Sequence, residues 1–359
     1  MIEMVKGFAN WISLPYYFVT LSVVILVAML VFKSWTRPRN FAILFSLFAA
    51  AFFLSCLDAN FRIIVVKADN LPIAGMLFLV IFFVWLALKQ AFDNDERIAA
   101  GKGPAEAEES KDKLLCWPHL VYTEFICLIL LTVVLVLWSI IVQAPIEQPA
   151  NLTESPNPSK APWYFLGLQE MLVYYDPWIA GVLLPGYIIV GLMAIPYIDT
   201  NPKGNGYYTF RERRWEVSLF LFGFVVLWIM LIILGTFLRG PNWNFFGPFE
   251  YWDVHRVEPL VNIHLSDILW VKMLGVGLPK NMFLREIFGI VVTLLYLFGL
   301  PVLLARTWAR RFYVKMGPAR YHVMMNLFLM MMSLPIKMYL RWAFNFKYVV
   351  NLPEIFFNI

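Results

Sequence analysis

Long apolar runs separated by short polar stretches dominate the chain. Eight runs approach or reach the roughly 20 residues that a helix needs to cross a bilayer. They cover residues 15–32, 41–57, 72–92, 119–143, 177–197, 215–237, 284–305 and 321–340. We therefore predict an all-α fold, a polytopic transmembrane helix bundle with about eight spans.

Two polar segments and a short tail interrupt or follow these runs. Residues 93–114 are charged and rich in small residues, which is typical of a cytoplasmic linker. Residues 238–280 are aromatic and rich in Pro and Gly, which favours an ordered loop outside the membrane. The final segment, FNFKYVVNLPEIFFNI, is too short for another span, and we expect it to lie along the outer surface.

Composition agrees with a membrane protein. Hydrophobic residues make up 61% of the 359 positions, charged residues 15%, and the mean hydropathy is +0.69. Soluble domains contain roughly 25% charged residues. The net charge of +5 therefore indicates no nucleic-acid partner, because Lys and Arg collect on the inner loops of membrane proteins.

The basic residues also predict an orientation. Arginines cluster tightly at span ends within residues 211–214 and 306–311, and such clusters stay on the inner side of the membrane. With alternating spans, residues 144–176 and 238–280 and both termini then face the outer, positive side. The loop at 144–176 begins Pro-rich and becomes amphipathic from Trp163 to Tyr175.

Histidine and cysteine usage argues against haem or metal ligation by this chain alone. No span holds two histidines spaced as a bis-His haem site requires; the four are His119, His255, His264 and His322. The three cysteines form no CxxC or CxxCH motif, and they are Cys56, Cys116 and Cys127. We predict no metal ligands.

Ionisable residues inside the spans, which would be candidates for transport chemistry, are scarce. Glu124 is the main exception, and Lys337 and Arg341 stand at the end of the last span, where we expect them to snorkel towards water. This scarcity weighs against a transporter, although it leaves that alternative open.

The segment APWYFLGLQEML resembles the loop of cytochrome b, and of subunit IV of b–f-type complexes, that carries a Pro-Glu-Trp-Tyr motif. The order of the neighbouring segments is similar too, over about residues 115–240. They are LCWPHLVYTEF, the Pro-rich approach QAPIEQPANLTESPNPSKAPWYF, the helix start DPWIAGVLLPG and the basic loop PKGNGYYTFRERRW.

The resemblance implies a membrane subunit of a bc-type quinol:cytochrome c oxidoreductase that contributes the quinol-oxidation site on the positive side. The substrate would be menaquinol or ubiquinol. The b haems and a Rieske iron–sulfur cluster would belong to partners: a haem-binding N-terminal-half cytochrome b subunit, a Rieske protein and a c-type cytochrome. The family's complexes are generally dimeric, and we expect this chain to contact membrane lipid.

The resemblance also implies the site residues. We expect the quinol to contact Pro162, Trp163, Tyr164, Phe165, Leu168 and Gln169. Pro162 stands where the family has its glutamate and Ala161 where it has its proline, so the family's proton acceptor is missing. Glu170 lies eight residues further on, about two helical turns away. We predict that Glu170 accepts the proton, with Tyr164 or Gln169 as hydrogen-bond partner; a solvated loop carboxylate is the alternative.

Four regions follow: an additional transmembrane region at 1–92, the linker at 93–114, a subunit-IV-like core at 115–240, and an outer loop with two spans and a surface tail at 241–359. We expect a bacterial inner membrane. The rival interpretation is a non-catalytic membrane anchor of a respiratory assembly, which the missing glutamate favours.

Overall fold

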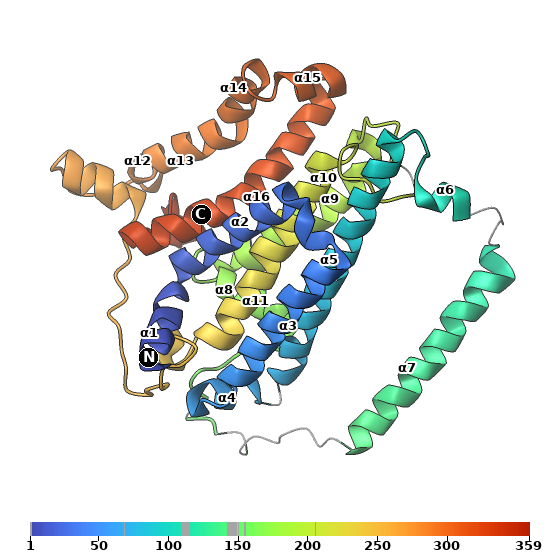
Figure 1. The fold of residues 1–359 in the computed structure, drawn as a ribbon. Coiled ribbons are helices and arrows are strands. Elements are labelled where there is room, and N and C mark those ends of the chain that lie inside the picture. The colour runs from blue at the N-terminus through green and yellow to red at the C-terminus, as the bar shows by residue number, and fades with distance from the viewer. Residues whose placement is uncertain are drawn as a thin grey trace. The chain divides into compact units, whose positions relative to one another are not determined.

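The computed structural model describes residues 2–67, 69–109, 115–141, 149, 151–153, 156–204 and 206–359. Within them, seven helices are long and apolar enough to cross a membrane: Pro38–Ser55, Leu71–Ala99, Cys116–Ile141, Ile179–Ile198, Arg214–Leu238, Ile287–Arg306 and Pro318–Phe344. The bent pair α1 and α2 brings the number to eight if it is one span. The predicted all-α bundle of about eight spans is confirmed (Figure 1).

The chain forms two compact units. The first comprises Met1–Val31, Asn157–Pro202 and Ser218–Ile359, and the second comprises Phe32–Pro156 and Lys203–Val217. The predicted four-region layout is not tested by this division, which groups residues by contact rather than by resemblance.

The first unit contains the segment that the resemblance singles out. Its helices are α1 (Ile2–Ile12), α2 (Pro15–Val31), α8 (Trp163–Met171), η3 (Ile179–Leu183), α9 (Leu184–Ile198), η4 (Phe222–Ile229), α11 (Met230–Ile233), η5 (Leu234–Leu238) and η6 (Pro241–Trp243). The remainder are η7 (Asp267–Met273), α12 (Met282–Arg285), α13 (Ile287–Leu294), η8 (Leu295–Gly299), α14 (Leu300–Arg306), α15 (Arg310–Met316), α16 (Pro318–Phe344) and η9 (Pro353–Ile355). Helix α10 (Arg214–Leu221) joins the two units along the chain.

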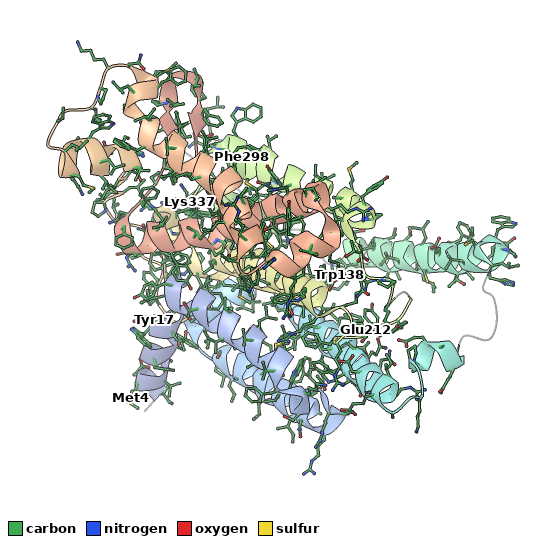
Figure 2. The ribbon with its side chains drawn as sticks, turned by 90° about the horizontal axis from the view of Figure 1, so that it is seen from above. Met4, Tyr17, Trp138, Glu212, Phe298 and Lys337 are labelled. Atoms are coloured by element: carbon green, nitrogen blue, oxygen red, sulfur yellow. The ribbon has the colours of Figure 1, made fainter. Side chains whose placement is uncertain are left out.

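Sequence explains several boundaries in the first unit. Helices α1 and α2 meet at an angle of 84°, and Pro15 begins α2, where its missing N–H costs nothing (Met4 and Tyr17 mark the two arms in Figure 2). After α16 the chain forms a two-residue antiparallel pair, β1 (Asn351–Leu352) with β2 (Phe357–Asn358). These are the only named strands in the described part of the chain.

The core of the first unit lies around the span that ends in η5. Buried side chains from α8, η4, α11, η5 and α16 form one cluster, which includes Met171, Tyr174, Leu231, Leu234 and Met338. Of the seven spanning helices, Arg214–Leu238 has the largest buried share, 39% of its most apolar window. This span is therefore the support against which the short helix α8 packs.

The second unit contains η1 (Lys33–Thr36), α3 (Pro38–Ser55), α4 (Ala59–Val65), α5 (Leu71–Ala99), α6 (Ala105–Glu109), η2 (Cys116–Leu120) and α7 (Val121–Ile141). Helix α5 continues to Ala99, so residues 93–99 of the predicted linker are helical. Asp95 explains the extension, because its buried carboxylate accepts hydrogen bonds from the Thr209 hydroxyl at 2.6 Å and the Arg211 backbone N–H at 3.0 Å. The loop that contains Thr209 and Arg211 is thereby tied to the end of α5.

Candidate functional site: the α8 helix and its anchors

Helix α8 divides the predicted site residues between a buried and an exposed environment. Pro162 precedes the helix as its N-cap residue. Trp163, Tyr164 and Phe165 are 41%, 49% and 51% exposed, whereas Glu170 is completely buried. The structure therefore places the predicted quinol-contacting aromatics at the surface of the unit and the predicted proton acceptor inside it.

The three aromatics form what we call the aromatic ledge, residues 163–165. The ring centroids of Trp163 and Tyr164 lie 5.8 Å apart, and those of Tyr164 and Phe165 lie 4.6 Å apart. Leu168 is half-buried against the core below. The ledge offers apolar ring surface and one phenolic hydroxyl, which suits an aromatic ligand with a polar substituent.

The Gln169 side chain links α8 to the Pro-rich segment that precedes it. Its side-chain Oε1 accepts a hydrogen bond from the Ala161 backbone N–H at 2.7 Å, and its Nε2 donates to the Ser159 carbonyl at 2.9 Å. Both ends of the amide are thus used to hold the Pro-rich segment against α8. This gives Gln169 a positioning role at the ledge.

Close packing sets the position of α8 on the span below it. A Cβ at Gly235 in η5 would lie only 3.0 Å from Cγ of Leu166 in α8, closer than side chains normally approach. Glycine at this position therefore lets the two backbones come together. Leu166 itself is 2% exposed.

Glu170 is the centre of a buried polar group that we call the Glu170 cluster: Glu170, Tyr174, Arg239 and Trp243. Its Oε1 accepts hydrogen bonds from Nη2 of Arg239 at 2.8 Å and from the Tyr174 hydroxyl at 3.0 Å. Its Oε2 accepts from Nε of Arg239 at 3.0 Å and from Nε1 of Trp243 at 3.1 Å. Such a two-point Arg–carboxylate contact is among the strongest polar interactions in proteins.

The backbone at Trp243 has an unusual conformation that the cluster holds in place. Asn242 and Trp243 both have φ of +57°, in the left-handed region that a bulky side chain rarely adopts. Nη1 of Arg239 donates to the Trp243 carbonyl at 2.7 Å while the indole donates to Glu170. The guanidinium also lies 3.6 Å from the ring centroid of Phe245.

Burial and charge act on the cluster's titrating groups in predictable directions. Burial opposes the charge on Arg239, but the charge and hydrogen bonds of Glu170 more than offset it and raise the pKa of the guanidinium. Burial, followed by the charge of Glu170, raises the pKa of the Tyr174 phenol well above its usual value. Arg239 therefore stays protonated and Tyr174 stays a hydrogen-bond donor across the physiological range.

Two further links tie the Pro-rich approach to η5 and to the segment after it. The Asn157 and Asn242 side chains are hydrogen-bonded at 3.1 Å, and Oδ1 of Asn157 accepts from the Asn242 backbone N–H at 2.8 Å. Nζ of Lys160 donates to the Thr236 carbonyl at 2.8 Å and lies 4.8 Å from the Trp252 ring. The ledge is thus supported by a well-connected base.

The C-terminal tail holds the other end of α8. Nζ of Lys347 donates to the Val173 carbonyl at 2.8 Å and to the Leu172 carbonyl at 3.2 Å, both just past the helix. Nδ2 of Asn358 donates to Asp176 at 2.9 Å. The tail therefore helps to position the site, a role that its sequence did not reveal.

Arg239, Trp243 and Tyr174 were not among the predicted site residues. The pairing of Glu170 with Arg239 joins positions 69 residues apart, and no local pattern reports it. A usable signal was the single arginine at the end of an apolar run, directly before Gly240 and Pro241. Among the described residues, no group of three or more His, Cys, Asp or Glu side chains is arranged to hold a metal ion.

Comparison with known proteins found a match for the segment that contains all four residues of the Glu170 cluster. The family model described as "Cytochrome b(C-terminal)/b6/petD" matches residues 149–249. No solved structure matched the chain. Residues 149–249 are therefore a cytochrome b C-terminal, subunit-IV-like domain within a multi-pass membrane protein, and this domain supports a place for the chain as a cytochrome b-type subunit of a bc- or b6f-type electron-transfer complex.

Proposed function

We propose that this chain contributes the positive-side quinol-oxidation site of a bc-type quinol:cytochrome c oxidoreductase and supports electron transfer and proton release there. The observation that carries the proposal is the aromatic ledge, residues 163–165, exposed at the start of α8 within the cytochrome b C-terminal domain. Menaquinol or ubiquinol is the substrate class.

The ledge has the chemistry that a quinol ring requires. Trp163 and Phe165 provide flat apolar surface for stacking, and the Tyr164 hydroxyl can hydrogen-bond a quinol oxygen. Pro162 limits the backbone freedom of the chain entering the helix. Gln169 and the Asn157–Asn242 pair hold this surface in place, so little ordering is left for the ligand to impose.

Glu170 as proton acceptor stays a prediction, and its surroundings define what it would need. A base must present a lone pair within hydrogen-bond reach of the donor. Four hydrogen bonds already reach its two oxygens, and the side chain is 0% exposed. Proton acceptance by Glu170 would therefore require the contact with Arg239 to open, whereas Tyr164 meets the ligand surface without rearrangement.

The proposal requires partner subunits. A haem-binding N-terminal-half cytochrome b would take one electron from the quinol through its b haems, and a Rieske protein would pass the other to a c-type cytochrome. The arginine clusters at 211–214 and 306–311 support an orientation with the ledge on the outer side of a bacterial inner membrane. A dimeric complex would follow the family pattern.

Haem reduction by quinol tests the proposal. The complex is purified gently, and its visible spectrum is recorded before and after addition of a quinol and then of dithionite. We expect Trp163→Ala to slow quinol-dependent reduction of the b haem about two- to tenfold, the equivalent of losing one aromatic contact of about 0.5–1.5 kcal/mol. Dithionite should still reduce the haem fully.

Trp308→Ala is the matched control, because Trp308 is an exposed tryptophan, 59% accessible, on the turn between α14 and α15. It should leave quinol-dependent reduction unchanged. Unaltered reduction in the Trp163→Ala complex would refute the ledge as the site.

A second candidate is a non-catalytic membrane anchor, which two observations favour. Pro162 stands in place of the motif glutamate, and Glu170 is held inside the unit. In that case the native complex would contain haem that dithionite reduces and quinol does not.

A further inference from the structure

Three cations gather at the end of α16 and the start of the tail, and we call them the cation cluster: Lys337, Arg341 and Lys347. Lys337 and Arg341 are only 4% and 8% exposed, and Lys347 is half-buried (Lys337 is labelled on α16 in Figure 2). The expectation that Lys337 and Arg341 snorkel to water is therefore wrong. Both side chains are enclosed within the unit.

The hydrogen-bond partners of the cluster are neutral backbone carbonyls. Lys337 donates to the Lys347 carbonyl. Nη1 of Arg341 donates to the carbonyls of Val261 and Asn345, each at 3.0 Å. The Lys347 ammonium donates to the two carbonyls beyond α8. Within the described ranges, none of the three forms an ion pair with a carboxylate.

Burial and neighbouring charges shift the pKa of Lys347. Burial, and then the charge of Arg341, lower its pKa to about 8, although Asp176 acts in the opposite direction. Lys337 and Tyr348 also lie close to it, with Nζ of Lys337 5.7 Å from the Tyr348 ring centroid. Buried like charges without counter-charge are costly, so this region has a surplus of positive charge that an anion would neutralise.

A cavity of about 770 Å³ adjoins the cluster. Its lining includes Arg341, Trp342, Asn345 and Lys347. Its other charged lining residues form ion pairs: Glu250 and Glu258 with Arg256 at 3.7 and 2.6 Å, and Arg239 with Glu170. Among the described lining residues, Arg341 and Lys347 are therefore the cations best placed to bind an anion.

The cavity lies where membrane spans end. Its walls include Pro15 at the start of α2, Arg239 directly after η5 and Trp342 in the last turns of α16. Lipid phosphates lie at this boundary between hydrocarbon and water, and tryptophan is enriched there.

We infer that this cavity binds the phosphate group of an anionic phospholipid, with Arg341 and Lys347 as its ligands. Arginine and lysine both bind phosphate, arginine through two parallel N–H donors and lysine as a point charge. The bound phosphate would neutralise the surplus charge and stabilise the tail that holds α8. The inference does not depend on quinol chemistry.

The test uses the full chain in its purified complex, stripped of lipid by repeated detergent exchange. Mixed micelles containing phosphatidylglycerol, micelles containing phosphatidylcholine, or inorganic phosphate are titrated in, and the thermal unfolding midpoint and bound phosphorus are measured. We expect phosphatidylglycerol to raise the midpoint at concentrations where the other two probes have little effect.

Variants locate the site. Lys347→Met removes one charge while keeping the length of the side chain, and it should weaken phosphatidylglycerol binding about tenfold or more, as loss of one charged hydrogen bond does. Lys315→Met, an exposed lysine on α15, is the control and should bind like the native protein. Should Lys347→Met fail to fold, Arg341→Lys keeps the charge but loses the guanidinium fork, and it should also weaken binding.

Three outcomes would overturn the inference. Binding by Lys347→Met or Arg341→Lys equal to that of the native protein would exclude these ligands. Equal protection by phosphatidylcholine would show that net negative charge is not recognised. Equal protection by inorganic phosphate would assign the site to a free anion rather than to a lipid.

Discussion

The Glu170 cluster and the cation cluster adjoin the same short helix, yet their charges are handled differently. In the first, a buried carboxylate meets a guanidinium in a two-point contact. In the second, the three cations donate their hydrogen bonds to backbone carbonyls. Removing one member of a balanced buried pair leaves an unpaired buried charge, which is costly, whereas the cations of the second cluster are the site that we propose for an anion.

The largest expected effect comes from breaking the balanced pair. Glu170→Gln would leave Arg239 buried without a counter-charge, and we expect it to lower the free energy of unfolding by about 3–5 kcal/mol. Unfolding of the detergent-solubilised complex measures the change. The double variant Glu170→Gln/Arg239→Gln should recover part of the loss, because no charge is then left unpaired.

The same variant separates the two roles of Glu170. Proton acceptance predicts an assembled, normally stable complex that oxidises quinol slowly. Loss of stability and assembly at unchanged turnover per intact complex would assign Glu170 to positioning alone.

A smaller effect should follow from removing one donor of the cluster while keeping its charges. Trp243→Phe leaves the carboxylate one hydrogen bond short, and it should destabilise the protein by about 1–3 kcal/mol. Trp138→Phe, on the exposed helix α7, serves as control. A loss equal to that of Glu170→Gln would show that the strained turn at Trp243, rather than charge pairing, dominates.

A still smaller change is expected at Lys160, which links the Pro-rich approach to η5. Lys160→Met removes the hydrogen bond to Thr236 and the contact with the Trp252 ring, for a loss of about 1 kcal/mol. Lys272→Met, at an exposed position of η7, should be neutral. A large loss of quinol oxidation with unchanged stability would instead place Lys160 at the ligand.

The smallest change in the free energy of unfolding at neutral pH should come from the titration of Lys347. The direction of this change with pH distinguishes the cation cluster from the Glu170 cluster. Its pKa of about 8 in the folded protein lies below the ordinary 10.5, so the unfolded chain binds the proton more tightly. The free energy of unfolding should therefore rise as pH increases from about 8 towards 10.5.

A mutation and a bound lipid each test this pH dependence of the free energy of unfolding. Lys347→Met should reduce it, and bound phosphatidylglycerol should flatten it, because a nearby phosphate raises the pKa of the ammonium. A dependence of equal slope in Lys347→Met would place the titrating group elsewhere.

The eight apolar runs predicted the spans to within a few residues at most ends. For example, 179–198 and 214–238 are observed where 177–197 and 215–237 were predicted. The segment before residue 15 was missed as a helix, because α1 is short and only partly apolar. The linker at 93–114 stays a prediction, and its first residues, 93–99, are the helical end of α5, where Asp95 is buried and hydrogen-bonded to Thr209.

The sequence alone determined the membrane class, the number of spans and the resemblance of the ledge segment, since each depends on runs of neighbouring residues and on the cost of exposing backbone to lipid. Only the tertiary structure decided that Glu170 faces Arg239, that Lys337 and Arg341 turn inward, and that the tail holds α8. Those outcomes depend on contacts between residues that lie far apart in the sequence and are buried away from water. The local sequence around each residue does not show which partner it will contact.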